Sequence, residues 1–141
     1  MKKSFMVVVG LAVIIGLTVF LAGQETGNAK EARIISITGG AAGNIQSIQV
    51  EPQELLISKG TVVVWNNWVL ANEVKVVFGD GKKCQNSTNA ETGFGLDAKS
   101  RYVSVILEGR TASLRFIEKG TYGYIVEAGN TVRQTGEIRV Q

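Results

Sequence analysis

From residue 33 onward the chain alternates apolar and polar residues in short runs, and no segment repeats apolar residues at helical spacing over a useful length. In GTYGYIVEA, residues 120–128, one face carries Tyr122, Tyr124 and Val126. Such period-two alternation is typical of a half-buried β-strand. Glycine-containing pairs such as Lys-Gly and Asp-Gly separate the runs and supply turns. The pattern predicts roughly seven or eight short strands in an antiparallel β-sandwich.

The start of the chain has a different character. Lys2 and Lys3 precede an uncharged apolar run, residues 5–22. A basic flank followed by an apolar run is typical of an export signal, and a run of about 18 residues is close to the shortest that spans a bilayer. Residues 21–23 are a poor cleavage site, and Gln24 stands where a bacterial lipoprotein signal has its lipid-carrying cysteine. Cleavage and retention as an anchor both stay open, with retention favoured.

Three segments follow from this change in composition. Residues 1–23 are predicted to be a signal peptide or an N-terminal hydrophobic helix that anchors the chain, and residues 24–32 a polar linker. Residues 33–141 are predicted to form one domain. We expect this domain to be extracytoplasmic, in the periplasm or at the surface of a bacterial cell, or secreted if the signal is cleaved.

The order of features in this domain resembles the cupredoxin family, the plastocyanin-like blue copper domains. The resemblance rests on IQVEPQELLISKGTVVVWNN, residues 48–67, and on the series of turn glycine, aromatic strand, loop (residues 128–135) and Gly136. In cupredoxins a segment of the form GTY-Y-C--H----M-G supplies three copper ligands, and a histidine after a Trp-Asn segment supplies the fourth. The resemblance covers residues 34–141 and implies a Greek-key antiparallel β-sandwich.

Every ligand position that the resemblance carries onto this sequence lacks its ligand. The cysteine falls on Val126, the second histidine on Gly129 and the methionine on Gln134. The first histidine falls on Asn72, or on Glu73 in a less favoured alignment. A type 1 copper site needs two imidazoles and a thiolate with a weak axial ligand, and this chain contains no histidine. Scaffold positions of the family are kept at Trp65, Asn67, Gly120, Tyr122, Tyr124 and Gly136.

Charge and residue content argue against two classes of function. The formal net charge is +3, of which Lys2 and Lys3 contribute two charges, and the remainder has no basic run. Nucleic acid is therefore not an expected partner, because phosphate binding needs clustered basic residues. No constellation of Lys, Asp, Glu or Ser suited to acid–base or nucleophilic chemistry is recognisable either, so we do not expect an enzyme.

Cys84 is the single cysteine of the chain and follows Lys82 and Lys83 in residues 79–101, a polar segment expected to lie outside the core. It is far in sequence from Val126, so it does not replace the missing thiolate. We expect an exposed or half-buried free thiol whose pKa the two ammonium groups lower. The alternative is an intermolecular disulfide, since an unpaired cysteine of an exported protein can join two chains.

Trp68, Val69 and Leu70 follow Asn67 at the predicted end of a strand. If exposed, they would form a patch for a protein partner. If buried, they would close that end of the sandwich, which is the favoured alternative. Tyr122 lies near the start of its strand and is expected to form a tyrosine corner.

Two functional hypotheses follow. The first is an exported, membrane-tethered cupredoxin-like domain without a type 1 copper site and without a cofactor. It would act by contact with an unknown protein at the membrane or cell surface, or as a structural subunit. The second is an extracytoplasmic electron-transfer protein that binds copper at an atypical site or at a site completed by a partner chain.

Overall fold

The computed structural model describes residues 31–41 and 44–141 of the 141-residue chain. The predicted signal or anchor, residues 1–23, and most of the predicted linker lie outside the described residues. Within the part described, no helix has the length and hydrophobicity needed to cross a membrane.

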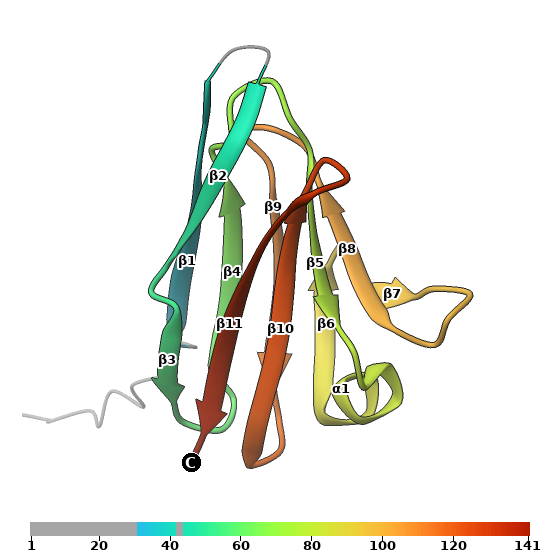
Figure 1. The fold of residues 1–141 in the computed structure, drawn as a ribbon. Helices are drawn as coiled ribbons and strands as arrows, with labels where there is room; N and C mark the ends of the chain where they lie inside the picture. The colour runs from blue at the N-terminus through green and yellow to red at the C-terminus, as the bar shows by residue number, and fades with distance from the viewer. Residues whose placement is uncertain (1–30, 42–43) are drawn as a thin grey trace, which may run out of the picture.

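Among the described residues, two β-sheets pack face to face and one short helix lies at one side (Figure 1). The first sheet has the order β2 (Asn44–Glu51), β1 (Ala32–Ala41), β4 (Val62–Asn67), β9 (Thr111–Phe116) and β6 (Thr88–Thr92). The second has the order β3 (Glu54–Ile57), β11 (Val132–Val140), β10 (Gly120–Ala128), β5 (Val74–Phe78), β8 (Tyr102–Ile106) and β7 (Gly95–Leu96). The helix, α1 (Gly81–Ser87), follows β5 in the chain.

Both sheets are mixed, which corrects the prediction of an antiparallel sandwich. β1 runs parallel to β4, with Ile35 beside Trp65, and β3 runs parallel to β11, with Leu55 beside Ile138. The other pairs are antiparallel. The parallel pairs arise because the chain passes from the first sheet to the second between β2 and β3 and returns at β4. Side chains alternate between the two faces of a strand in parallel and in antiparallel sheets alike. The alternation in the sequence therefore did not indicate the relative direction of neighbouring strands.

The core lies between the sheets and is built around aromatic rings from both. Trp65 of β4 packs edge-on against Phe78 of β5 and Tyr124 of β10, with ring centroids 6.0 and 5.7 Å apart. Phe94 also contacts Trp65, at 5.3 Å between centroids. Such pairs stabilise a core beyond the burial of their area. The face of β10 predicted from its alternation is buried along its length, which confirms that prediction.

Tyr122 forms the predicted tyrosine corner. Its hydroxyl donates a hydrogen bond of 2.9 Å to the carbonyl oxygen of Glu118, four residues upstream. Its ring packs against Phe116 with centroids 5.1 Å apart, and the Lys83 ammonium lies 5.5 Å from the ring centroid. The side chain therefore joins the β9–β10 turn to α1.

Residues 79–101 are part of the packed domain and are not the separate excursion that was predicted. The Asp80 carboxylate caps α1 by accepting a hydrogen bond of 3.1 Å from the Lys83 backbone N–H. α1 buries Gly81 and Cys84 and leads directly into the edge strand β6. A Cβ at Gly81 would lie 2.2 Å from the Ser100 carbonyl oxygen, so the chain packs closely there. Two buried positions in one short helix are too few for hydrophobic periodicity to predict it.

Candidate functional site at the loop end

The sequence-predicted ligand positions lie at or next to one end of the sandwich, which we call the loop end. It contains the β4–β5 connection (residues 68–73), the β8–β9 connection (residues 107–110) and the β10–β11 connection (residues 129–131). The loop end is at the top of Figure 1. The side chains and backbone groups of these connections form the surface of the loop end.

The β10–β11 connection is a tight hairpin, which corrects the loop predicted for residues 128–135. Backbone pairing continues along the strands from Val126 opposite Gln134 to Ala128 opposite Val132. A short turn then closes the hairpin. The backbone groups that a longer ligand-bearing loop would leave free are therefore paired with each other.

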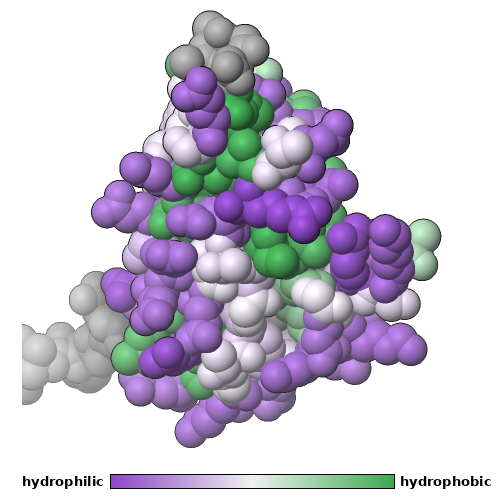
Figure 2. All heavy atoms as spheres, in the orientation of Figure 1, coloured by the Kyte–Doolittle hydropathy of each residue, from purple (hydrophilic) through white to green (hydrophobic). Residues whose placement is uncertain are grey.

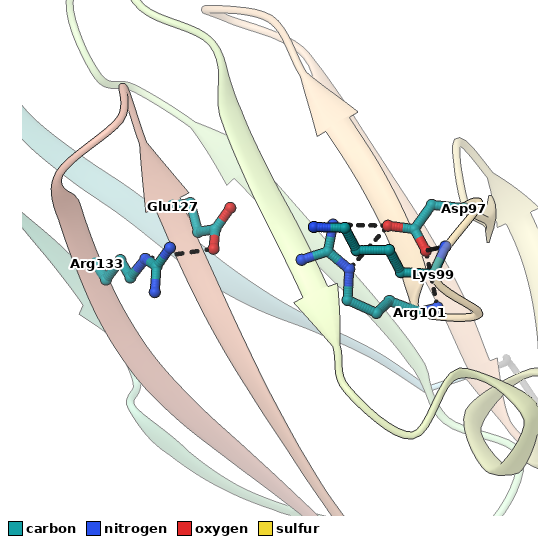
Figure 3. A network of polar contacts seen from close by, with 5 residues as sticks. All are labelled: Asp97, Lys99, Arg101, Glu127 and Arg133. Carbon is teal, nitrogen blue, oxygen red and sulfur yellow. Dashed lines mark hydrogen bonds and ion pairs between the residues drawn. The ribbon is translucent and has the colours of Figure 1, made fainter.

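Three local features stabilise this hairpin. Gly129 has a φ of 61°, a left-handed conformation that glycine adopts at little cost. On the inner face Val132 packs against the core. On the outer face the Glu127 carboxylate and the Arg133 guanidinium form an ion pair across the strands, at 3.4 Å (Figure 3). The sequence contained all three features, but their cross-strand partners depend on the register.

The structure brings the four degenerate ligand positions together in two pairs. Asn72 and Gly129 line one pocket at the loop end. Val126 is fully buried and lies opposite Gln134, which is half-buried and lines a different pocket along β2 and the β2–β3 connection. The other residues that line the first pocket are Glu73, Lys75, Glu127 and Asn130.

The residues present do not fit a type 1 copper centre. Val126 and Gly129 offer no donor atom, and the Asn72 side-chain amide donates a hydrogen bond of 2.7 Å to the Leu70 carbonyl oxygen. A Cβ at Gly129 would lie 3.8 Å from Ile45 Cδ1, so an apolar side chain stands beside the place where an imidazole would project. Among residues 31–41 and 44–141, no group of three or more His, Cys, Asp or Glu side chains is placed to hold a metal ion. The donor set that copper prefers is therefore not assembled here.

Asn67 organises the backbone of the loop end. Its side chain is fully buried, and Nδ2 donates to the carbonyl oxygens of Asn72 and Ile106, both at 2.8 Å. Its Oδ1 accepts a hydrogen bond of 2.9 Å from the Val69 backbone N–H, and its own N–H donates to the Arg110 carbonyl at 3.1 Å. The side chain thus closes the β4–β5 connection on itself and joins it to β8. The resemblance marked Asn67 as a scaffold position, and in this chain the residue supports the loop end through these hydrogen bonds.

Three large apolar side chains project from the loop end. Trp68 and Leu70 are 55% and 51% exposed, and Leu107 of the β8–β9 connection is 57% exposed. We call these three residues the loop-end patch. Val69, between the first two, is fully buried. The expectation that this segment closes the sandwich therefore holds for Val69, whereas Trp68 and Leu70 face solvent. Sequence reasoning missed Leu107, although a leucine directly before a Glu-Gly-Arg turn was a usable signal.

Cys84 is only 2% exposed, which corrects the expectation of an exposed or half-buried thiol. Burial raises the pKa of this thiol to about 12, and the opposing effect of Lys83 is smaller. The predicted lowering of the pKa by neighbouring lysines is therefore wrong, because loss of hydration disfavours the thiolate more than one nearby ammonium favours it. An intermolecular disulfide would require Cys84 to leave this buried position.

A separate hollow lies on the outer face of the second sheet. Gly123, Val77 and Ile125 line it, together with the carboxylates of Glu54 and Glu137. Figure 2 shows this face, with hydrophobic colour at mid-height and hydrophilic colour around it. None of the sequence-predicted site residues lines the hollow.

Comparison with known proteins shows that the fold of this chain is similar to folds among solved structures. No family model matches the chain, and no curated protein matches it. Its fold is similar to that of amicyanin, a cupredoxin. A reduced amicyanin variant is 20% identical with a TM-score of 0.49, over 80% of this chain and 85% of that chain. A reduced Cu(I) form of another variant at pH 4 is 20% identical with a TM-score of 0.48, over 78% and 82%. Amicyanin from Paracoccus versutus (Thiobacillus versutus) is 17% identical with a TM-score of 0.45, over 75% and 81%. At these identities the similarity assigns no ligand or partner to this chain.

Proposed function

We propose that this chain is an exported, membrane-tethered module of cupredoxin type that has no type 1 copper site. It acts by contact with another protein or as a structural subunit, without a cofactor and without catalysis. The observation that carries the proposal is the closed β10–β11 hairpin, with Val126 buried and Gly129 beside Ile45. Apolar side chains fill the place in the hairpin where metal ligands would stand, so no buried ligand atoms are left that would need a metal ion as their partner.

Export and tethering are supported by the basic flank and apolar run of residues 1–23. We expect the mature chain to keep this segment and to stay with the membrane fraction after extraction with alkaline carbonate. The mass of the mature chain measures retention directly. A mature chain whose mass shows that the N-terminal segment has been removed, and which is found in the soluble fraction, would show that the protein is secreted and not tethered.

The absence of a copper site is tested by adding Cu(II), and Cu(I) under reducing conditions, to the purified full chain. We expect no intense blue colour and no change in the unfolding midpoint with either copper or a chelator, because the donor set is missing. The matched control is Cys84→Ser, which removes the single thiol. A blue colour that appears in the wild type and vanishes in this variant would contradict the proposal.

The alternative is a copper electron carrier whose site is completed by a partner chain. It predicts a blue colour in native membranes loaded with copper and none in the purified chain. Optical and electron paramagnetic resonance spectra of the same membranes, with and without this chain, separate the two functions.

A further inference from the structure

We propose that the edge of β10 at Thr121 and Gly123 is a docking site for a single extended segment of another protein, which pairs its backbone with this edge and carries a basic side chain. The site adjoins the hollow on the outer face of the second sheet. The inference rests on the proposed function, because it names the surface and the partner chemistry of a module that acts by protein contact.

This edge of β10 is open because β5 leaves it. The two strands are neighbours in the second sheet, but their pairing ends at Ile125 and Val77. Below this pair β5 turns away towards α1, whereas β10 continues to the lower end of the sandwich (Figure 1). The lower half of β10, residues 120–124, therefore has a paired strand on one side only, where it lies beside β11.

The register shows which way the backbone groups of this half point. Gly123 lies opposite Glu137 of β11, and the Glu137 N–H donates to the Gln53 carbonyl oxygen at 2.8 Å, on the side of β3. Residues directly opposite in an antiparallel pair either bond each other or both point away. The N–H and C=O of Gly123 therefore point away from β11, into the opening that β5 leaves. Those of Thr121, two residues earlier on the strand, point the same way.

These backbone groups have no partner on the open side. Within the part of the chain that the structure describes, no hydrogen bond joins Thr121 or Gly123 to β5, to α1 or to a side chain there. Both residues are exposed. Unpaired N–H and C=O groups along a strand edge are a template for an added strand. A peptide backbone supplies donors and acceptors at the same spacing, which the surface of a lipid bilayer does not.

There is space beside the edge for one segment. The hollow on the outer face has a volume of about 520 Å³, and ligand sites commonly have about 300–1,000 Å³. Gly123 lines it and also lines a smaller cavity between β10 and α1, together with Lys83. A Cβ at Gly123 or at Gly79 would meet nothing within 4 Å. Because α1 bounds the opening, a free segment fits it better than an edge strand of a second folded copy, which is joined to its own sheet.

The charged residues of the hollow favour a cationic occupant. Glu54 and Glu137 line it, and no basic residue does. Arg139 pairs with Glu137 at 2.6 Å, whereas the Glu54 carboxylate has no hydrogen bond or ion pair with the described residues. Two carboxylates therefore share one guanidinium, which attracts a further positive charge. Because Gly123 has no side chain, an arginine or lysine of the bound segment has a free path across β10 towards these carboxylates.

Amide hydrogen exchange followed by nuclear magnetic resonance tests the edge. The sample is the full chain in detergent micelles, and the probe is an acetylated, amidated peptide of sequence TVRVT. In the free protein we expect fast exchange at Thr121 and Gly123 and slow exchange at Tyr124, whose N–H faces β11. Saturating peptide should slow exchange at Thr121 and Gly123 by at least about tenfold. The same peptide N-methylated at every residue lacks the donors and should give no protection.

The Glu54→Gln substitution tests the charge, with binding measured by fluorescence anisotropy of the labelled peptide. It should weaken binding of the arginine peptide about threefold to fivefold. A peptide with glutamine in place of arginine should bind the wild type and this variant equally. The matched control is Glu118→Gln, which removes another exposed carboxylate, on the β9–β10 turn, and should leave the binding of both peptides unchanged.

Each other outcome overturns the inference. Slow exchange at Gly123 in the free chain would show that the edge closes on itself, or on a second copy if the slowing depends on protein concentration. Binding without protection of Gly123 would place the peptide elsewhere, and no binding at about 1 mM peptide would remove the site. These results leave the proposed function standing, because the copper titration tests it separately. A blue colour in that titration would contradict the function whether or not the peptide binds.

Discussion

At the scale of single residues, Asn67 shows how one side chain can replace several backbone partners. It is fully buried and satisfies Val69 N–H and the carbonyl oxygens of Asn72 and Ile106. A buried amide is tolerated only when its donors and acceptor are paired. The shape of the loop end therefore depends on this residue more than on the exposed residues it supports.

We expect Asn67→Ala to lower the free energy of unfolding by about 3 kcal/mol, because it leaves buried backbone groups without partners. The control is Asn66→Ala, since Asn66 is half-buried on the outer face of the same strand, and its loss should cost about 0.5 kcal/mol. Urea unfolding of both variants measures the difference. Equal costs would show that the side-chain network contributes nothing.

A second prediction at this scale concerns alkaline pH. The Tyr124 hydroxyl and Trp65 Nε1 are buried without a hydrogen-bond partner among the described residues. Burial raises the pKa of Tyr124 to about 12. The pKa of Tyr124 in the folded protein lies above the ordinary value for tyrosine. The contribution of its neutral hydroxyl to the free energy of unfolding is therefore fully present below about pH 10 and is lost as the pH rises from there towards 12. Tyr124→Phe should lose less stability than the wild type between about pH 9 and about pH 11.5. Parallel pH profiles of the two proteins would refute this assignment.

At the scale of elements, two glycines of the β10–β11 hairpin differ in their surroundings: Gly136 is in close contact with a side chain, whereas Gly123 faces open space. Gly136 lies opposite Tyr124, and a Cβ placed on Gly136 would come within 2.2 Å of the Tyr124 ring. Gly123, on the same hairpin, would place a Cβ in open space. The ring of Tyr124 is therefore accommodated by the absence of a side chain on the neighbouring strand.

We expect Gly136→Ala to destabilise the domain by about 3 kcal/mol, because the Tyr124 ring must move within a packed core. Gly123→Ala should change stability by about 0.5 kcal/mol or less, since its backbone conformation suits alanine. Thermal or urea unfolding of the pair is the measurement. A large cost at Gly123 instead would mean that the outer-face hollow is occupied in solution.

The β7–β8 connection gives a prediction at acidic pH. Asp97 accepts hydrogen bonds from the backbone N–H groups of Lys99 and Arg101, both at 2.9 Å, and from Arg101 Nε at 2.8 Å (Figure 3). The Arg101 side chain, followed by its backbone N–H, lowers the pKa of Asp97. The contribution to stability is therefore present above the ordinary carboxyl pKa and is lost as the pH falls through the lowered value. The difference in stability between the wild type and Asp97→Asn should shrink as the pH falls from about 6 to about 3. A difference that stays constant over this range would contradict it.

At the scale of the whole molecule, the two sheets are held together through one aromatic cluster. Trp65 belongs to the first sheet, and its neighbours Phe78 and Tyr124 belong to the second. Residues 79–101 close one side by way of α1 and Phe94, which also contacts Trp65. Loss of the central ring should therefore weaken both sheets at once.

The two tryptophans provide a matched test of this view. Trp65→Ala should cost about 4 kcal/mol, because it leaves a cavity between the sheets, and unfolding should stay a single transition. Trp68→Ala should cost less than about 1 kcal/mol, since Trp68 is largely exposed. Differential scanning calorimetry measures both effects. Comparable losses would place Trp68 in the core.

The residues of the chain were enough to predict a mostly β fold, the buried face of β10 and the tyrosine corner. These features depend on alternation, on turn residues and on the identity of single side chains, which are local. The sequence could not reveal that α1 buries Cys84, because its few buried positions have no readable period. It also could not separate buried Val69 from exposed Trp68 and Leu70, since all three are apolar.

The sequence by itself determined which atoms are missing from this protein, because a histidine that is absent from the chain cannot be supplied by any folding of that chain. The tertiary structure decided strand direction, the closure of the β10–β11 hairpin and the outward placement of the loop-end patch. These properties depend on which strands become neighbours across long sequence distances. The free energy that selects those neighbours comes from packing between the sheets, to which no single segment contributes alone.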